Sequence, residues 1–523
     1  MTYTDKRINW ARSIKNASGA QNNISHTSLK RSRYNIVVKL SDGGALIFNS
    51  STRTLARLSA DELGQYDSFV SEKPTPLSAS LAADGFLVGS ARNELTETKV
   101  KYLQAKRDSS LLLLTIAPTM ACNLACGYCF QGLNKDLDNA SRDHPDEIIE
   151  FIKSKLEGVN KISVTWYGGE PLMAKENIYS TSDKIISLCD RYGIAYSSSI
   201  VTNGYFLDVK VAQQLWSRRV TSAQVTIDGL EKTHDKMRPL ISGRGSYKKI
   251  IENIGNVLEQ TPLTVAMRVN VGRENVDECN ELLDEMKRHG FDKRPNFQLY
   301  FSPIDAATED SGTAFDVSLS KEEFNKAVVK LTMRGIEMGL IAQIEAPGGF
   351  LGMCVAAHDN GFVITHRGDI HKCWETAHDT RKRVGEIAKP EKIPDNLNKK
   401  IWDSWTPFDS DVCKACKILP MCGGHCGHRF IYSGAGNDFA LPCPEWKWNT
   451  AEYIFARAKA LGAVRDEDWM DGASTSIALQ SGERHSPESL LAAQSKVIDR
   501  VNEVSFTSID RDYILSGDGR DFE

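Results

Sequence analysis

The stretch Ala121-Cys-Asn-Leu-Ala-Cys-Gly-Tyr-Cys-Phe130 decides the fold and most of the chemistry of this chain. Its cysteines, Cys122, Cys126 and Cys129, have the spacing C-x3-C-x2-C and follow the apolar run Leu111–Ile116. Three thiolates can bind three irons of a cubane iron–sulfur cluster, which leaves the fourth iron without a protein ligand. An iron with an open coordination position can bind a small molecule directly. The competing interpretations are a zinc site and chance spacing.

Strand and helix patterns alternate on both sides of this stretch, and such alternation predicts an α/β fold with a parallel sheet and right-handed crossovers. The predicted strands are 112–118, 161–167, 195–202, 222–228, 263–271 and 296–302. Glycine and polar motifs end three of them: Trp166-Tyr-Gly-Gly-Glu-Pro171, Thr202-Asn-Gly204 and Val225-Thr-Ile-Asp-Gly229. In α/β folds these strand ends carry the functional site.

The cysteine spacing and the strand-end motifs together resemble the radical S-adenosylmethionine (SAM) enzymes. The resemblance implies that residues 108–305 form a partial (β/α)6 barrel and that Cys122, Cys126 and Cys129 bind a 4Fe–4S cluster. In that family the amino and carboxylate groups of SAM chelate the open iron. One electron then splits the sulfonium, and the resulting 5′-deoxyadenosyl radical takes a hydrogen atom from the substrate.

The same resemblance implies a set of contacts to SAM. In the family the glycine motif receives the methionine amino group, and glycine allows the backbone to approach a ligand closely. An aromatic residue before the last cysteine borders the adenine, and a guanidinium pairs with the carboxylate through its fork of donors. The sulfatase-maturing branch adds a threonine. The expected contacts are Tyr128, Gly168, Gly169, Glu170, Thr226, Arg238, Arg268 and Asn270.

A second group of cysteines follows the predicted barrel. Cys354 precedes Gly368 by thirteen intervening residues, and Cys373 follows after four more. The pattern continues as Cys413-x2-Cys416-x5-Cys422-x3-Cys426, and then sixteen residues to Cys443. A zinc ribbon is the alternative, but seven thiolates do not divide into two complete four-cysteine zinc sites. The pattern resembles the SPASM domain of radical SAM maturases, which we expect over residues 346–449.

The SPASM resemblance implies two auxiliary 4Fe–4S clusters, and therefore three clusters in the whole chain. One would be closed by Cys413, Cys416, Cys422 and Cys443, and the other would be held by Cys354, Cys373 and Cys426. Some relatives have one more cysteine between the first two positions, and this chain has none between 354 and 373. The fourth iron there is either open or bound by another residue. Four histidines lie nearby in sequence and are expected at the surface or in supporting positions: His358, His366, His371 and His425.

The two other cysteines, Cys189 and Cys279, lie in helical apolar patterns and are expected to be buried fillers. Residues 1–29 are polar and predict a flexible arm. Residues 306–345 predict a linker that contains a long helix beginning at the capping box Ser320–Glu323, and residues 450–523 predict a helical tail with helices at 450–461 and 487–503.

Residues 30–98 have the pattern of a small separate module. Strands are predicted at 34–40, 44–48 and 54–58, and helices from the capping box at Ser59 and over 77–83, followed by the stretch 85–88. This arrangement is winged-helix-like and is similar to the leader-peptide recognition elements fused to peptide-modifying enzymes. The alternative is a plain N-terminal cap on the barrel.

The composition excludes two classes of partner. Net charge is −4 with Lys and Arg spread along the chain, so no nucleic-acid footprint is present. The first residues lack the apolar core of a signal peptide, and the apolar runs are too short to span a membrane. We therefore expect a cytoplasmic protein without a membrane partner, whose cysteines bind metal rather than form disulfides.

These expectations together predict a peptide-modifying enzyme. A radical SAM/SPASM oxidoreductase would abstract a side-chain hydrogen from a ribosomally synthesised precursor peptide, bound through its leader, and install a carbon–carbon cyclophane or thioether cross-link. Auxiliary clusters would accept the surplus electron, and a flavodoxin- or ferredoxin-type protein would supply electrons. One alternative is formylglycine formation, as in anaerobic sulfatase maturases; these have an Asp after the second SPASM cysteine, where this chain has Trp374 and then Glu375. The other is a non-catalytic iron–sulfur electron carrier.

Overall fold

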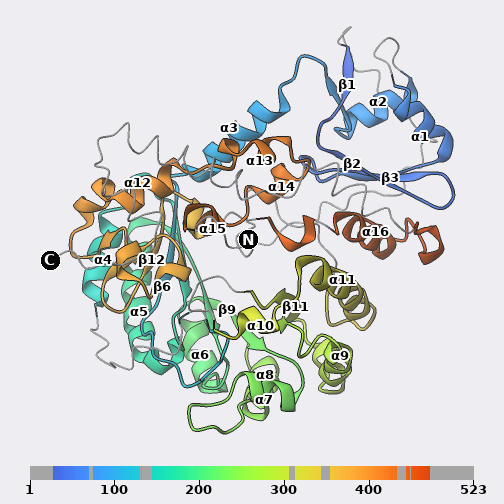
Figure 1. Ribbon diagram of the computed structural model, residues 1–523. Coiled ribbons are helices and arrows are strands. Elements are labelled where there is room, and N and C mark those ends of the chain that lie inside the picture. Colours follow the sequence, from blue (N-terminus) through green and yellow to red (C-terminus); the bar gives the residue numbers. More distant parts are fainter. Residues whose placement is uncertain are drawn as a thin grey trace.

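The centre of the molecule is a nine-stranded sheet with the order β11-β10-β9-β8-β7-β6-β12-β13-β14 (Figure 1). The computed structural model describes residues 28–69, 75–129, 131, 144–305, 312–342, 354–432, 443–447 and 449–470. Six consecutive strands of the sheet are parallel neighbours. They are β6 (Leu111–Ile116), β7 (Lys161–Trp166), β8 (Ala195–Thr202), β9 (Val220–Ile227), β10 (Thr264–Val271) and β11 (Phe297–Pro303). The predicted α/β fold with a central parallel sheet is confirmed.

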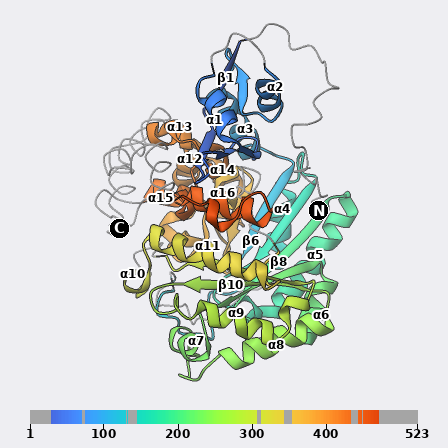
Figure 2. The ribbon, with the colours of Figure 1, turned by 90° about the vertical axis from the view of Figure 1, so that its right-hand side faces the viewer.

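Helices connect these strands and pack along the sheet (Figure 2). They are α4 (Pro145–Lys153), α5 (Lys175–Tyr192), α6 (Val209–Ser217), α7 (Glu231–Met237), α8 (Tyr247–Gln260) and α9 (Cys279–Arg288). The apolar run of β6 is typical of a strand that is buried between layers, and α5 ends where Gly193 adopts φ +65°, a left-handed cap that glycine tolerates. Cys189 and Cys279 are fully buried, as predicted.

The cysteine-rich segment shares this sheet rather than forming a detached domain. Strand β12 (Gly361–Ile364) pairs in parallel with β6, and β13 (Asp369–His371) and β14 (Gly385–Glu386) continue the sheet in antiparallel pairs. Phe362 of β12 meets Phe151 of α4 edge to face, with ring centroids 5.4 Å apart. The segment also contains the helices α12 (Leu397–Ser404), α13 (Asp411–Ala415), α14 (Leu419–Cys422) and α15 (Gly427–Tyr432).

The N-terminal region forms a three-stranded antiparallel sheet of β2 (Asn35–Lys39), β3 (Ala45–Asn49) and β4 (Leu55–Leu58). The helices α1 (Ala60–Asp67) and α2 (Pro76–Ala83) and the strand pair β1 (Leu29–Arg31) with β5 (Leu87–Gly89) complete it. The capping box predicted at Ser59 is present. In β3, Ala45 and Ile47 join a local core, whereas Leu46 and Phe48 join the main core of the molecule. This small sheet is therefore buried on both faces.

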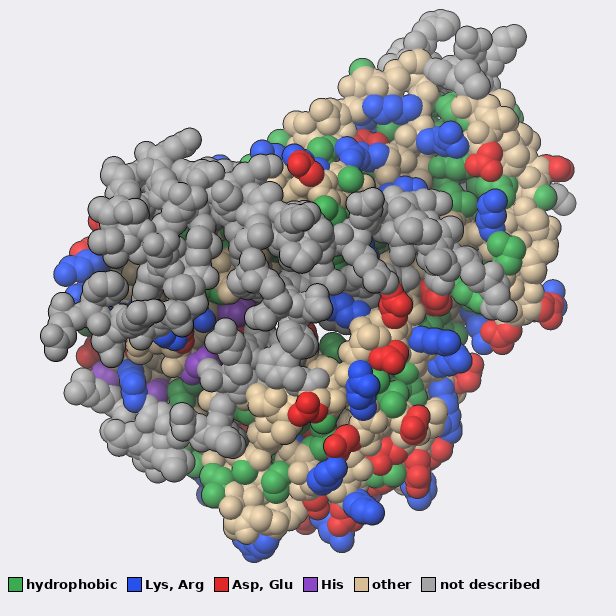
Figure 3. Space-filling view, in the orientation of Figure 1, with side chains coloured by type: hydrophobic (Ala, Val, Ile, Leu, Met, Phe, Trp, Pro, Cys, Tyr) green, Lys and Arg blue, Asp and Glu red, His purple; other side chains and the backbone are tan. Residues whose placement is uncertain are grey.

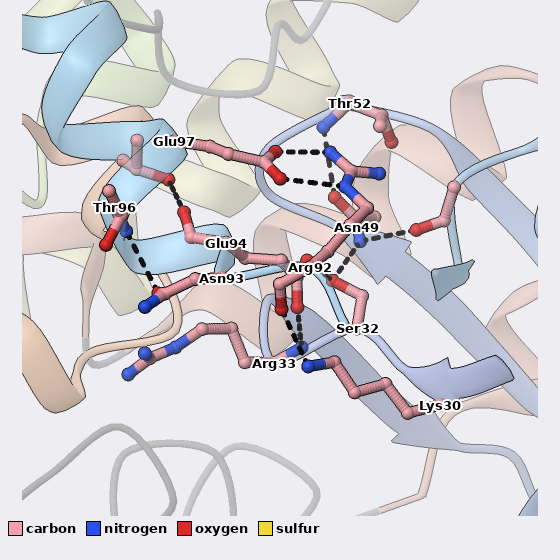
Figure 4. Close-up of polar contacts among 12 residues, drawn as sticks. Lys30, Ser32, Arg33, Asn49, Thr52, Arg92, Asn93, Glu94, Thr96 and Glu97 are labelled. Carbon is pink, nitrogen blue, oxygen red and sulfur yellow. Dashed lines mark hydrogen bonds and ion pairs between the residues drawn. The ribbon is translucent and has the colours of Figure 1, made fainter. Parts of the chain in front are cut away.

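Helix α3 (Glu94–Lys106) runs through the boundary expected at residue 98 and connects the N-terminal region to the rest of the chain. Figure 4 shows the N-terminal end of this helix, where the Glu94 carboxylate accepts hydrogen bonds from Ser32 Oγ at 2.5 Å and from the Arg33 backbone N–H at 2.9 Å. At its last turn the buried Lys106 ammonium donates to the carbonyls of Ala357 and Trp402 at 3.3 and 3.0 Å. The helix therefore joins the N-terminal sheet to the cysteine-rich segment.

Two further helices complete the described structure after the short α10 (Ala314–Val317). Helix α11 (Lys321–Glu337) begins with the predicted capping box at Ser320, and α16 (Thr450–Ala460) packs against α11 and against β2 and β3. The predicted helix at 487–503 and nearly all of the predicted arm at 1–29 lie outside the described residues. Among the described helices, none combines the length and hydropathy needed to cross a bilayer. Acidic and basic side chains are interspersed on the face shown in Figure 3.

Candidate functional site

The loop with Cys122, Cys126 and Cys129 leaves the carboxyl end of β6. Cys122 and Cys126 are buried and Cys129 is half-buried. The loop is fixed on two sides by backbone hydrogen bonds. On one side, Gly169 and Glu170 donate to the carbonyls of Thr119 and Ala121 at 3.1 and 2.8 Å; on the other, Ala125 donates to Pro239 O at 2.8 Å and Leu124 bridges to Leu240.

The glycines of the motif after β7 are required by this loop. A Cβ on Gly168 would lie 2.2 Å from the Thr119 carbonyl oxygen, and a Cβ on Gly169 would lie 2.2 Å from that of Ala121. Gly168 also has φ +127°, where side chains are strained. The expected reason for these glycines was close approach of a ligand; in the structure the approaching group is the backbone of the cysteine loop.

Glu170 is fully buried, and its carboxylate is bonded within the protein. It accepts from the Leu172 N–H at 3.0 Å, from Thr202 Oγ1 at 2.7 Å and from the Asn203 N–H at 2.7 Å. Burial raises the pKa of Glu170, although these hydrogen bonds oppose the shift. The side chain therefore joins the ends of β7 and β8, and the contact to SAM expected of it stays a prediction.

A buried polar network lies beside the loop, centred on Tyr128. The Tyr128 hydroxyl donates to Asp228 Oδ2 at 2.5 Å and accepts from Arg238 Nη1 at 2.7 Å and from Asn270 Nδ2 at 3.2 Å. Arg268 Nε donates to Asn270 Oδ1 at 2.8 Å. Four of the expected SAM contacts are thus brought together, on elements as distant as the cysteine loop and β10.

Asp228, the acidic member of this network, was not among the predicted site residues. It is fully buried at the end of β9, and burial raises its pKa although Arg238 opposes the shift. Its backbone N–H donates to Nδ1 of the buried His234 at 3.2 Å. In the sequence, Asp228 is indicated by its position in the motif Val225–Gly229, directly after a strand.

The network has hydrogen-bonding capacity that the described protein atoms do not use. Arg238 Nε and Asp228 Oδ1 are buried without a hydrogen-bond partner among the described residues. Thr226, also buried, is the parallel-register neighbour of Arg268 on β10. Asp228 Oδ1 also lies 3.9 Å from Arg238 Nη1 in an ion pair. A ligand with both a carboxylate and an amine, such as SAM, fits a guanidinium N–H and a carboxylate oxygen that lack hydrogen-bond partners.

The first auxiliary group consists of Cys413, Cys416, Cys422 and Cys443. Burial raises the pKa of the Cys413 thiol to about 12, and the thiols of Cys443 and Cys416 contribute to the shift. Burial likewise raises the pKa of Cys422 well above its usual range, with contributions from the other three. Three of these residues are buried and Cys422 is half-buried. Four thiols so grouped have the donor chemistry that a cubane requires.

The second auxiliary group consists of Cys354, Cys373 and Cys426, with Glu375 beside them. Burial raises the pKa of Cys426 to about 11, and Cys354 and Glu375 contribute to the shift. Burial also raises the pKa of Cys373 well above its usual range, and Glu375, Cys354 and Cys426 contribute to that shift. Burial also raises the pKa of Glu375 itself to about 7, and its Oε2 has no hydrogen-bond partner within the described structure. The three thiols and one carboxyl group are thus close enough to influence one another, although Cys373 is buried, Cys426 is half-buried and Cys354 is exposed.

Of the four nearby histidines, only His425 is exposed. His358, His366 and His371 are buried, which leaves the supporting position, one of the two expected, as the prediction for these three. His371 contacts Thr376 Oγ1 through Nδ1 at 3.2 Å, and burial lowers its pKa to about 4. The reason is that the hairpin β12–β13 is incorporated into the central sheet.

The first loop and the second auxiliary group are linked by an aromatic contact. Tyr167, which precedes the glycine motif, stacks on Trp374, which follows Cys373, with centroids 5.4 Å apart and ring planes 21° from parallel. In the described parts of the chain, no three His, Cys, Asp or Glu side chains converge as ligands of one metal ion do. A cubane needs less convergence, since each thiolate binds a different iron.

Comparisons with known proteins agree with this geometry. The model of the radical SAM superfamily matches residues 116–286. The serine-type anaerobic sulfatase-maturating enzyme of Bacteroides thetaiotaomicron is 30% identical over 357 residues, which span 62% of this chain and 85% of that protein. The mycofactocin maturase MftC of Mycolicibacterium smegmatis is 22% identical over 343 residues, or 62% of this chain and 81% of that protein.

A solved structure of polyhistidine-tagged anSMEcpe with bound AdoMet shares the fold, with a TM-score of 0.51 and 19% identity over 68% of this chain and 98% of that one. The family match covers the cysteine loop and the strand-end motifs up to Arg268 and Asn270. The chain therefore belongs to the radical SAM superfamily, whose defining domain implies SAM and a 4Fe–4S cluster as cofactors.

Proposed function

We propose that this radical SAM enzyme is a maturase that installs an oxidative cross-link, a cyclophane or a thioether, in a ribosomally synthesised precursor peptide. The observation that carries the proposal is the presence of two further groups of clustered thiols beside the main core, in addition to the cysteine loop, which forms a small cluster of its own. Their donor chemistry supports two auxiliary 4Fe–4S clusters, and with them a SPASM-type segment over residues 346–449.

At the first site, Cys122, Cys126 and Cys129 hold the cluster that binds SAM. When bound, the two cofactors would supply the chemistry for removing a hydrogen atom from the substrate. Arg238 pairs with the SAM carboxylate, and Asp228 and Tyr128 hold that guanidinium in place. The remaining contacts are those expected from the family: Gly168, Gly169, Glu170, Thr226, Arg268 and Asn270.

The auxiliary groups explain why the reaction is oxidative. When a substrate carbon radical forms a bond to a ring carbon or to a thiol, one proton and one electron must leave. The clusters at these thiols would provide a one-electron acceptor near the substrate. A hydrogen-abstracting enzyme whose product is not oxidised has less need of such an acceptor.

The substrate would be delivered by its leader to residues 30–98, acting as a winged-helix-like module. In support, β4 is an edge strand of the β2-β3-β4 sheet, and an extended peptide can add to a strand edge. Arg33 Nη2 of this module donates to Lys414 O of the cysteine-rich segment at 2.6 Å, so the module adjoins the auxiliary sites. A flavodoxin- or ferredoxin-type reductant and a cytoplasmic location complete the proposal.

A second candidate is formylglycine formation on a protein substrate. The relatives at 30% identity are named as sulfatase-maturating enzymes, and Glu375 places a buried carboxyl group beside Cys373. Such a carboxyl group could take the proton from the oxidised side chain. The substitution of Trp374 for the Asp of that branch weakens this candidate.

The decisive experiment is anaerobic reconstitution followed by assay on two substrates. The proposal expects about twelve irons per chain and 5′-deoxyadenosine formation under dithionite. It also expects a peptide encoded beside the gene to lose two hydrogen atoms per cross-link without gaining an aldehyde. A sulfatase peptide that becomes reactive toward a hydrazide probe would favour the second candidate. Absence of 5′-deoxyadenosine would favour a non-catalytic carrier.

A matched variant separates the two kinds of cluster. Cys413→Ala should leave SAM cleavage near the parent rate and abolish the cross-linked product, because it removes the electron acceptor and leaves the radical source. Cys122→Ala should abolish both. Equal loss of both activities in well-folded Cys413→Ala would contradict the proposed division.

A further inference from the structure

Lys447 is a buried cation at the four-cysteine group. Its side chain is 3% exposed, and its Nζ lies 3.7 Å from the Sγ of Cys443 in hydrogen-bonding geometry. The ammonium is also within electrostatic range of Cys416, Cys413 and Cys422. One positive charge therefore faces all four thiols of the group.

The backbone around Lys447 holds the side chain in this position. The residue ends a 3-10 turn (Glu445–Lys447) that follows Cys443, and its carbonyl accepts from Thr450 Oγ1 at 2.9 Å at the start of α16. A second lysine, Lys321 of α11, donates to the Cys443 carbonyl from the other side. Cys443 is thus approached by two ammonium groups, one at its sulfur and one at its backbone.

A buried ammonium is costly unless a negative charge compensates it. The thiolates around a bound cubane would supply such charge. The position of Lys447 is therefore the one expected for a group that is complementary to a bound anionic cluster. The same reasoning predicts the effect of Lys447 on reduction of the cluster. Reduction adds one electron without making or breaking a bond, and a nearby cation stabilises the added charge.

We propose that Lys447 raises the reduction potential of the cluster held by Cys413, Cys416, Cys422 and Cys443, and so favours transfer of the surplus electron to it. The inference rests on the proposed function for the presence of that cluster. Hydrogen bonds to cluster sulfurs and nearby charge are two of the means by which proteins set these potentials. Lys447 supplies both with one side chain.

The test is a redox titration of the full-length, anaerobically reconstituted protein, followed by electron paramagnetic resonance. The signal lost in Cys413→Ala identifies the cluster. At the midpoint potential of the parent protein, the ratio of reduced to oxidised cluster should be about tenfold lower in Lys447→Met. For a one-electron couple, this corresponds to a midpoint potential that is about 59 mV lower. Lys447→Arg, which keeps the charge, should restore most of the parent midpoint.

The matched control is Lys414→Met. Lys414 lies between Cys413 and Cys416 in sequence, but its side chain is 36% exposed and paired with Asp411, so solvent screens its charge. Its removal should leave the midpoint unchanged. An equal shift in both variants would mean that net charge, not the buried contact, sets the potential, and would overturn the inference.

The remaining outcomes are also decisive. An unchanged midpoint in Lys447→Met with full iron content would overturn the role of Lys447 and leave the proposed function intact. A parent protein without any signal that depends on Cys413 would overturn both. If Lys447→Met loses the cluster altogether, retention of cluster and midpoint by Lys447→Arg supports the electrostatic role, and loss in both variants opposes it.

Discussion

At the scale of single residues, the candidate site depends on polar groups that are buried and shared. The Tyr128 hydroxyl alone contacts Asp228, Arg238 and Asn270, and these partners come from widely separated parts of the chain. A buried polar group that loses its partner costs more free energy than the hydrogen bond itself contributes. One atom therefore affects several residues at the proposed SAM site.

Tyr128→Phe should reduce both stability and SAM binding. The variant leaves the donors of Arg238 and Asn270 unsatisfied, which we expect to cost about 1–3 kcal/mol of unfolding free energy and to weaken SAM binding measured by calorimetry. Tyr300→Phe is the control, because Tyr300 is 38% exposed and its hydroxyl contacts only Gln224 among the hydrogen bonds described; its effect should stay within about 0.5 kcal/mol. Equal effects of the two variants would contradict the shared network.

Gly169→Ala should displace the cysteine loop. The added Cβ would lie 2.2 Å from the Ala121 carbonyl oxygen, so the backbone before Cys122 must move. We expect loss of the first cluster, measured as iron per chain, and a lower melting temperature. The contrasting variant is Gly64→Ala in α1, where a Cβ meets nothing within 4 Å; it should leave iron content unchanged and stabilise the helix by about 0.5–1 kcal/mol.

The sequence identified most of the site residues because their chemistry is tied to local motifs. Cysteine spacing and strand-end glycines can be read without coordinates. The internal bonding of Glu170 and the place of Asp228 could not be predicted, since each depends on which strand ends meet across the sheet. Proximity of Glu375 to Cys354 and Cys426 likewise arises from packing between segments that are distant in sequence.

At the scale of elements, a buried imidazole connects α7 to its neighbours. His234 accepts the Asp228 N–H through Nδ1, so its proton lies on Nε2, which faces Ser246 Oγ at 3.1 Å. Its ring also meets Tyr247 of α8, with centroids 5.4 Å apart. The helix is thus connected to the end of β9 and to the start of α8, and Arg238 follows directly after it.

His234 should make the fold sensitive to mild acid. Burial lowers the pKa of His234 well below the ordinary 6.5, and Arg238 acts in the same direction. Below pH 6.5 the unfolded chain binds a proton that the folded chain does not. The contribution of His234 to the free energy of unfolding is therefore complete above pH 6.5 and declines as the pH falls, by up to about 1.4 kcal/mol per pH unit.

In His234→Asn the melting temperature should be lower at pH 7.5 and should fall less steeply toward pH 5.5 than in the parent. His289→Asn serves as the control, since His289 is exposed after α9 and should leave the slope unchanged. A parent-like slope in His234→Asn would show that His234 is not the group responsible.

The elements themselves were predicted well where the pattern was long and regular. All six parallel strands of the barrel region overlap their predicted ranges, and both capping boxes, at Ser59 and Ser320, are present. Strand β12 was missed because four residues give too little periodicity. Helix α3 was missed because its polar sequence buries few apolar side chains, and its ends are fixed instead by Glu94 and Lys106.

At the scale of the whole molecule, the cysteine-rich segment and the barrel region are one folding unit. Strand β12 covers β6, which would otherwise be an exposed edge, and the main core extends from β2 to α16. The sequence pattern suggests separable domains with a boundary at residue 346, whereas β6 and β12, which lie on either side of that boundary in the chain, pair in one sheet.

A chain that ends at residue 342 should therefore not fold. It exposes the edge of β6 and removes Phe362 from Phe151, and exposed apolar strand edges promote aggregation. We expect aggregates in size-exclusion chromatography, whereas the full chain gives a discrete species under the same buffer. A monomeric fragment 1–342 with a cooperative thermal transition would contradict a single folding unit.

The pairing of β6 with β12 has a consequence for the rate of electron transfer. Electron tunnelling slows steeply with distance, so a hinge between two redox centres would make the rate vary with every motion of the hinge. Here the segments bearing Cys129 and Cys373 follow β6 and β13, which pair with opposite edges of β12, and neighbouring strands lie about 4.8 Å apart. Tyr167 also stacks on Trp374. For the clusters proposed at these cysteines, the scaffold itself would set the tunnelling gap, and substrates of different length would share one rate of electron transfer between them.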